Sequence, residues 1–132
     1  MEHVLSLSYG KDSLACLGAI EQLDWPLDRI VHAEVWATDT IPADLPPMVA
    51  FKAKADAIIK ERWGLTVEHV RMGVTFERQF YTCYQSGRWA GKVYGWPRTK
   101  GSWCCDRLKT HILDKVKHGG VSYVGIAEDE ED

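Results

Sequence analysis

The chain has 132 residues, 45% of them hydrophobic, which fits one domain with a buried core and makes a second domain unexpected. Its formal net charge is -3, but residues 128–132 are five consecutive acids, so residues 1–127 carry +2, too little for a dedicated nucleic-acid-binding protein. Because no apolar run reaches about 18 residues and no signal-peptide pattern is present, we expect a cytoplasmic protein without membrane contact and, in that reducing compartment, no structural disulfide.

The first predicted element is a strand at 4–7, followed by a polar loop from Ser8 to Ser13 and by a helix with apolar side chains at every third position. The first backbone N–H groups of a helix have no partner and carry the positive end of its dipole, so this junction is suited to a phosphate or sulfate. Gly10 allows an anion to approach the backbone, and Lys11 adds a positive charge. Asp12 is better suited to a magnesium ion or a ribose.

The next elements are a strand and a long helix. Arg29 to Ala37 is predicted as a strand, and Thr38-Asp39-Thr40 follows at its carboxyl end. Pro46-Pro47 then begins a helix that ends near Trp63, because Gly64 is a typical helix terminator. Its predicted apolar stripe consists of Met48, Phe51, Ala55, Ile58 and Ile59.

A third strand is predicted from Thr66 to Val70, and Thr75 can cap a helix from Phe76 to about Ser86. Aromatic residues recur every fourth position in this helix, at Phe76, Phe80 and Tyr84. Such a stripe is more often part of the core than a ligand-binding surface, so we assign it to the core. Cys16 and Cys83 are expected to pack inside the first helix and this one, respectively.

A loop from Gly87 to Ser102 follows, and the segment that runs on to Lys109 mixes basic and aromatic residues. Its members are Arg88, Lys92, Arg98, Lys100, Arg107 and Lys109, interleaved with Trp89, Tyr94, Trp96 and Trp103. Arginine and lysine can hold phosphate oxygens while an aromatic ring stacks on a base, so we favour closure over a nucleotide. A solvated surface loop and a surface for single-stranded nucleic acid are the alternatives, and the small net charge makes nucleic acid the least favoured.

The chain then alternates a helix, Cys105 to His118, with a strand, Val121 to Ile126. Strands separated by helices predict an α/β fold, namely a Rossmann-like, doubly wound and mainly parallel sheet with helices on both faces. Ligands bind such sheets beyond the carboxyl ends of the strands. The loop at residues 8–13, Thr38 to Thr40, and the segment from Gly125 to Glu128 all lie at such ends.

Four segments resemble motifs of one family, the phosphoadenosine-phosphosulfate reductase-like branch of the PP-loop ATP pyrophosphatase superfamily. The loop at 8–13 reads S-Y-G-K-D-S, and Thr38-Asp39-Thr40 resembles the family's T-D-T-like tripeptide, although Ile41-Pro42-Ala43 replaces the usual Gly-x-Glu. Residues 103–109 resemble W-C-C-x-x-x-K, and residues 125–130 resemble G-I-R-x-x-E, with Ala127 at the arginine. The similarity spans residues 4–130, so residues 1–127 are interpreted as the nucleotide-binding domain and 128–132 as an acidic tail.

The resemblance implies an adenine nucleotide as ligand, either ATP or phosphoadenosine phosphosulfate, with magnesium as an optional companion at Asp12. The expected nucleotide-binding residues are Ser8, Tyr9, Gly10, Lys11, Ser13, Thr38, Asp39, Thr40, Arg107, Lys109 and Gly125, with Lys11 and Asp12 as the catalytic candidates. Cys104 and Cys105 are redox candidates, but two adjacent thiolates are too few for an iron–sulfur cluster, which we do not expect.

The activity implied by the resemblance has three versions. The first is an enzyme of sulfur metabolism or sulfur transfer that acts on a phosphosulfate or polyphosphate nucleotide, with a protein reductant or partner subunit. The second is an ATP pyrophosphatase that adenylates an acceptor, and the third is a nucleotide-binding module without chemistry. The reductases carry an attacking cysteine in a C-terminal tail, and no cysteine follows Cys105 here. His32, His69 and His111 have no obvious partner and are interpreted as structural or surface residues.

Overall fold

The computed structural model of the chain describes residues 1–97, 106–117 and 119–126. Its strands are β1 (His3–Ser6), β2 (Arg29–Glu34), β3 (Glu68–Arg71) and β4 (Val121–Tyr123). Its helices are α1 (Lys11–Gln22), α2 (Pro46–Trp63), α3 (Phe76–Tyr81), a π-helical turn η1 (Asp106–Thr110) and α5 (His111–Lys117). No helix in these ranges is both long and apolar enough to cross a membrane.

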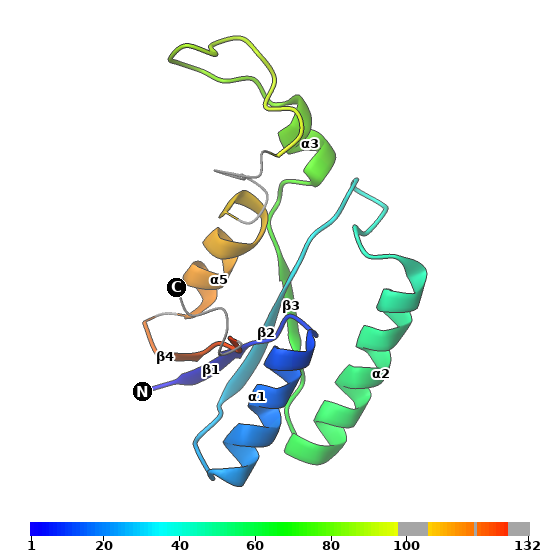
Figure 1. The fold of residues 1–132 in the computed structure, drawn as a ribbon, viewed down its shortest axis with the longest axis vertical. Coiled ribbons are helices and arrows are strands. Elements are labelled where there is room, and N and C mark those ends of the chain that lie inside the picture. The colour runs from blue at the N-terminus through cyan, green and yellow to red at the C-terminus, as the bar shows by residue number, and fades with distance from the viewer. Residues whose placement is uncertain (98–105, 118, 127–132) are drawn as a thin grey trace.

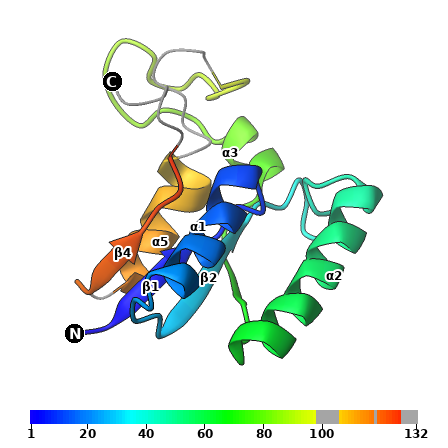
Figure 2. The same cartoon turned by 60° about the horizontal axis from the view of Figure 1, so that its bottom comes forward.

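The described strands form one parallel sheet in the order β3-β2-β1-β4. Helices α1 and α2 lie on one side of the sheet and α5 lies on the other (Figures 1 and 2). The chain therefore winds outward from β1 through β2 to β3, and then returns across the opposite face to place β4 beside β1. The predicted parallel α/β arrangement is confirmed.

The core lies between the sheet and the helices α1 and α2. Leu5 of β1 pairs in register with Ile30 of β2, and both side chains are fully buried. Leu17 of α1 and Ile59 of α2 pack onto them. Leu17 and Ile20 of the predicted apolar positions in the first helix are therefore buried, whereas Leu23, which follows the end of α1, is 54% exposed.

Helix α2 has the predicted bounds, and Gly64 ends it in a left-handed conformation with φ 72°. Its predicted apolar stripe is only partly correct. Ile59 is buried, and Met48 and Ala55 pack partly against the core, but Phe51 and Ile58 are 44% and 51% exposed. The stripe spans a wider arc than the sheet covers, since α2 lies toward the edge strand β3.

The predicted helix from Phe76 to Ser86 is too long, because α3 ends at Tyr81. Its start is confirmed, since the Thr75 hydroxyl accepts a hydrogen bond from the Arg78 N–H. Residues 82–97 instead fold back on themselves, with the N–H of Tyr94 donating to Thr82, and they project away from the sheet (Figure 1). Cys83, which was expected inside the helix, is therefore exposed, whereas Cys16 packs partly against the core.

The aromatic stripe is not part of the sheet core, so that assignment was wrong. Phe76 and Phe80 contact Trp96 with ring centroids 5.9 and 5.1 Å apart, and Tyr84 contacts Tyr94 at 4.2 Å. Because α3 ends early, residues 82–97 fold back and bring Tyr94 and Trp96 against these rings. All three are partly buried.

The remaining boundaries differ by a few residues. The strand expected from 29 to 37 ends at Glu34, the one expected from 66 to 70 runs from Glu68 to Arg71, and the one expected from 121 to 126 ends at Tyr123. The helix expected from 105 to 118 begins with η1 at Asp106 and continues as α5 to Lys117. Cys105, His118 and the acidic tail at 128–132 lie outside the described residues.

Candidate functional site

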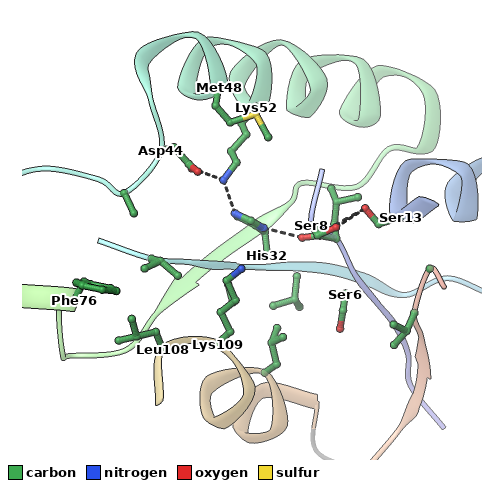
Figure 3. Close-up of a pocket in the computed structure, with 18 residues that line it drawn as sticks. Ser6, Ser8, Ser13, His32, Asp44, Met48, Lys52, Phe76, Leu108 and Lys109 are labelled. Atoms are coloured by element: carbon green, nitrogen blue, oxygen red, sulfur yellow. Dashed lines mark hydrogen bonds and ion pairs between the residues drawn. The ribbon is translucent and has the colours of Figure 1, made fainter. Parts of the chain in front are cut away.

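A cavity of about 520 Å³ lies at the carboxyl ends of β1 and β4, beside β2 (Figure 3). Both helical layers contribute to it, α2 from one side of the sheet and η1 with α5 from the other. Its walls consist of Ser6, Leu7, Ser8, Ser13, Val31, His32, Ala33, Val35, Ala43, Asp44, Met48, Lys52, Phe76, Leu108, Lys109, Leu113, Val124 and Gly125. This size is within the usual range for a small-molecule site, and the mix of apolar walls and a few polar groups is typical of one.

The loop at residues 8–13 borders this cavity through Ser8 and Ser13. Their hydroxyl oxygens lie 3.0 Å apart, and Ser13 also donates to the carbonyl of Gly10 at 3.2 Å. No described side chain caps the N-terminus of α1, so the first N–H groups of this helix keep their capacity to bind an anion. The Ser6 hydroxyl, also in the cavity wall, is a buried oxygen for which no hydrogen-bond partner exists among the described residues.

The strained residue of the loop is Tyr9. Its φ is 63°, in the left-handed region that disfavours residues other than glycine, whereas Gly10 is extended at φ -77°. Its side chain does not line the cavity but is buried beneath the loop, 3% exposed. Gly10 therefore has no conformational need to be glycine, and a Cβ there would make only an ordinary contact with the Ser8 hydroxyl.

Gly125 lies against the first turn of α1. A Cβ at this position would be 2.6 Å from the carbonyl of Asp12 and 2.7 Å from the backbone nitrogen of Ser13. Such distances are far inside van der Waals contact, so only glycine lets the chain after β4 lie this close to the loop. The first and last motifs of the sequence thus meet at one wall of the cavity.

Lys109 extends from η1 toward the middle of the cavity, on the side of the sheet opposite Lys52 (Figure 3). Of the other residues in the same motif, Arg107 belongs to η1 but its side chain lies outside the described part, as do Cys104 and Cys105. Among the described basic residues of the segment at 87–109, Lys109 therefore reaches the cavity.

Other predicted site residues do not line the cavity. Lys11 and Asp12 occupy the first turn of α1 with Lys11 exposed, and neither belongs to the cavity wall. Thr38, Asp39 and Thr40 form an exposed turn in which the Thr38 hydroxyl accepts from the N–H groups of Thr40 and Ile41. Asp39 pairs instead with Arg78 at 3.7 Å.

His32, Lys52 and Asp44 form a polar group in the cavity wall that we did not predict from the sequence. The Lys52 ammonium lies 2.9 Å from His32 Nε2 and donates to Asp44 (Figure 3). His32 Nδ1 lies 2.7 Å from the carbonyl of Leu7. Since a lysine can only donate and a carbonyl can only accept, His32 carries its proton on Nδ1 and accepts at Nε2. It is the neutral imidazole.

Burial lowers the pKa of His32 below its ordinary value, against the opposing effect of the Leu7 carbonyl, and the Lys52 charge lowers it further. The unfolded chain therefore binds a proton at a higher pH than the folded chain. Between the folded pKa and the ordinary value of 6.5 the unfolded state holds more protons, so stability falls as the pH drops below 6.5.

We accordingly expect the free energy of unfolding to decrease from pH 7.5 to pH 5.5, with a His32 contribution of at most about 1.4 kcal/mol per pH unit. Urea denaturation of wild type and His32→Gln at both values measures it. The variant should show a shallower decrease, because glutamine does not titrate. An equal decrease in both proteins would assign the pH dependence to other groups.

A second polar group lies under Tyr9. The Tyr9 hydroxyl donates to Asp56 of α2 and lies 3.2 Å from His69 Nε2. The two ring nitrogens of His69 lie 2.7 Å from Asp56 and 2.8 Å from Glu34. Burial and the Asp56 carboxylate raise the pKa of the Tyr9 hydroxyl above its ordinary value, so it remains a donor at neutral pH. The expectation that His32 and His69 lack partners was therefore wrong.

The signal for these residues is present but weak in the sequence. Lys52 and Asp56 fall at the same three- and four-residue spacing as Met48, Ala55 and Ile59, so a helical reading puts them on the sheet-facing side of α2. Charged residues in a buried stripe require partners. Which partners they find depends on β2 and β3, which the spacing does not reveal.

Within the described ranges, no three His, Cys, Asp or Glu side chains are arranged to hold a metal ion. Asp12 alone would supply one oxygen to a magnesium ion, and the nucleotide would have to supply others.

Comparisons with protein-family models, with curated proteins and with solved structures gave no match to this chain.

Proposed function

We propose that this chain binds an adenine nucleotide in the cavity, as a PP-loop protein of the phosphoadenosine-phosphosulfate reductase-like type that acts on a phosphosulfate or polyphosphate nucleotide. One observation carries the proposal. Ser8 and Ser13, Lys109, and Gly125 come from three of the resembling segments, and they all line the same cavity although up to 117 positions separate them in the sequence. The pairing of β4 with β1 brings Gly125 beside the loop, and Lys109 enters the same cavity from η1.

The strand order supports the same proposal. In a Rossmann-like sheet, ligands bind beyond the carboxyl ends of the strands where the winding direction reverses. Here the reversal lies between β1 and β4, and the loop after β1 and Gly125 after β4 border the cavity from these two strands. We therefore interpret the fold as Rossmann-like and doubly wound.

The chemistry of the walls fits a nucleotide. The N-terminus of α1 with Ser8 and Ser13 would hold the phosphate or sulfate, and Lys109 would add a positive charge. Side chains such as Met48, Phe76 and Leu108 offer an apolar surface for the base. The described part of the cavity wall contains no cysteine. We therefore propose that these residues bind a nucleotide, and we propose no reductive step.

Calorimetric titration tests the proposal. The purified chain is titrated with ATP, with adenosine 5′-phosphosulfate and with its 3′-phosphorylated form, each with and without magnesium. We expect saturable one-to-one binding of at least one of them, and adenosine without phosphate should bind far more weakly, because the anion site contributes most of the polar contacts. Absence of binding by all three nucleotides would refute the proposal.

Lys109→Met is expected to weaken nucleotide binding by roughly 1–2 kcal/mol, the scale of one charge-assisted contact at an exposed position. Lys115→Met is the matched control, since Lys115 is exposed on the adjoining helix and does not line this cavity. Titration of both variants measures the difference. Equal affinities would remove Lys109 from the site.

A further inference from the structure

We infer that Lys52 binds an anionic group of the ligand and that Asp44 is its resident counter-ion, which this anionic group displaces. Neither residue belongs to the segments that suggested the function. The inference rests on the proposed function, because it takes the ligand to be an adenine nucleotide.

Lys52 is held firmly in the cavity wall. Its side chain is only 12% exposed and extends from the middle of α2 toward β2. Its ammonium contacts Asp44 and His32, and it lies 5.3 Å from the centre of the Tyr9 ring. His32 is a neutral partner, and Asp44 is the only carboxylate among the described residues that pairs with this ammonium.

The geometry leaves Lys52 able to bind a ligand. An ammonium donates three hydrogen bonds, and the described acceptors, Asp44 and His32, account for two. His32 in turn is anchored by the Leu7 carbonyl of the segment that leads into the loop at 8–13. A positive charge is thus positioned close to the chain that carries the proposed anion site, and both line one cavity.

The side chain of Asp44 can move more freely than that of Lys52. Its side chain is 36% exposed and belongs to the segment before α2, so it can turn toward water, whereas Lys52 cannot leave the wall without losing His32. A phosphate or sulfate that enters the cavity meets the Asp44 carboxylate near the cation that it needs. The two negative charges repel each other, so the Asp44 carboxylate must turn away from the anion or it weakens binding.

The experiment compares three variants by calorimetry with ATP, adenosine 5′-phosphosulfate and its 3′-phosphorylated form. Asp44→Asn keeps the shape but removes the negative charge, and we expect roughly threefold to tenfold tighter binding. Lys52→Met should weaken binding about tenfold or more, as loss of a buried charged contact does. In the double variant the gain from Asp44→Asn should disappear, because the two effects act on one interaction.

Two exposed residues of α2, Lys54 and Glu61, provide controls, and Lys54→Met and Glu61→Gln should leave affinity unchanged. Thermal unfolding of each ligand-free variant shows whether it is folded, and Asp44→Asn gives a usable answer even if Lys52→Met does not fold. If wild type binds a nucleotide but Asp44→Asn binds it no better, the inference is wrong and the proposed function stands. If wild type and all variants bind none of the three nucleotides, both are wrong.

Discussion

Gly125→Ala is expected to abolish nucleotide binding in the cavity, with at least a hundredfold loss of affinity. The added Cβ would lie 2.6 Å from the Asp12 carbonyl and 2.7 Å from the Ser13 nitrogen, and these are backbone atoms that cannot rotate away. Either the first turn of α1 or the end of β4 must therefore move. Overpacking of this kind costs about 1–3 kcal/mol of stability. Titration measures the affinity, and urea denaturation measures the stability.

Gly18→Ala is the matched control for this substitution. Gly18 lies within α1, and apart from its chain neighbours and the backbone of its own helix a Cβ there meets no atom within 4 Å. Alanine favours a helix more than glycine does, so this variant should be more stable by up to about 1 kcal/mol and should bind nucleotide as wild type does. Normal affinity of Gly125→Ala would show that the close approach of β4 to the loop does not shape the binding site.

Tyr9→Ala is expected to cause the largest loss of stability, about 3–5 kcal/mol. The ring is 3% exposed and packs in the core with Leu5, Leu17 and Ile30, so its removal leaves a cavity. The hydroxyl also holds Asp56, and the strained backbone at φ 63° persists because these contacts over-determine it. Without them the loop should relax and lose nucleotide affinity as well. Chemical denaturation, and titration under conditions where the variant is folded, measure both effects.

Tyr9→Phe separates the hydroxyl from the ring. The variant keeps the packing but leaves one Asp56 oxygen without its donor, so we expect a loss of about 1–2 kcal/mol. Tyr81→Phe is the control, because Tyr81 is 66% exposed and its substitution should change stability by less than about 0.5 kcal/mol. If Tyr9→Phe is as stable as wild type, the contact with Asp56 contributes nothing to the fold.

Some residues of the candidate site could be predicted from the sequence and others could not. Four predicted site residues line one cavity, namely Ser8, Ser13, Lys109 and Gly125. They could be predicted because each belongs to a segment with its own recognisable pattern. Thr38 to Thr40 have a pattern too, but their turn is satisfied by the Thr38 hydroxyl and lies away from the cavity. A local pattern shows where a chain can turn, and not what the turn will contact.

The sequence by itself determined the order of strands and helices, the bounds of α2, the cap at Thr75 and the parallel α/β arrangement. The elements and the cap depend on residues a few positions apart, whose spacing and side-chain chemistry are visible in the chain. The parallel arrangement follows from the alternation of strands with helices. Only the tertiary structure decided that Tyr9 rather than Gly10 takes the strained conformation, that α3 ends at Tyr81, and that His32 and His69 have partners. His32 and Lys52 are 20 positions apart, and Tyr9 and His69 are 60 apart. Such pairs form only after the sheet and α2 have packed together, so no local pattern encodes them.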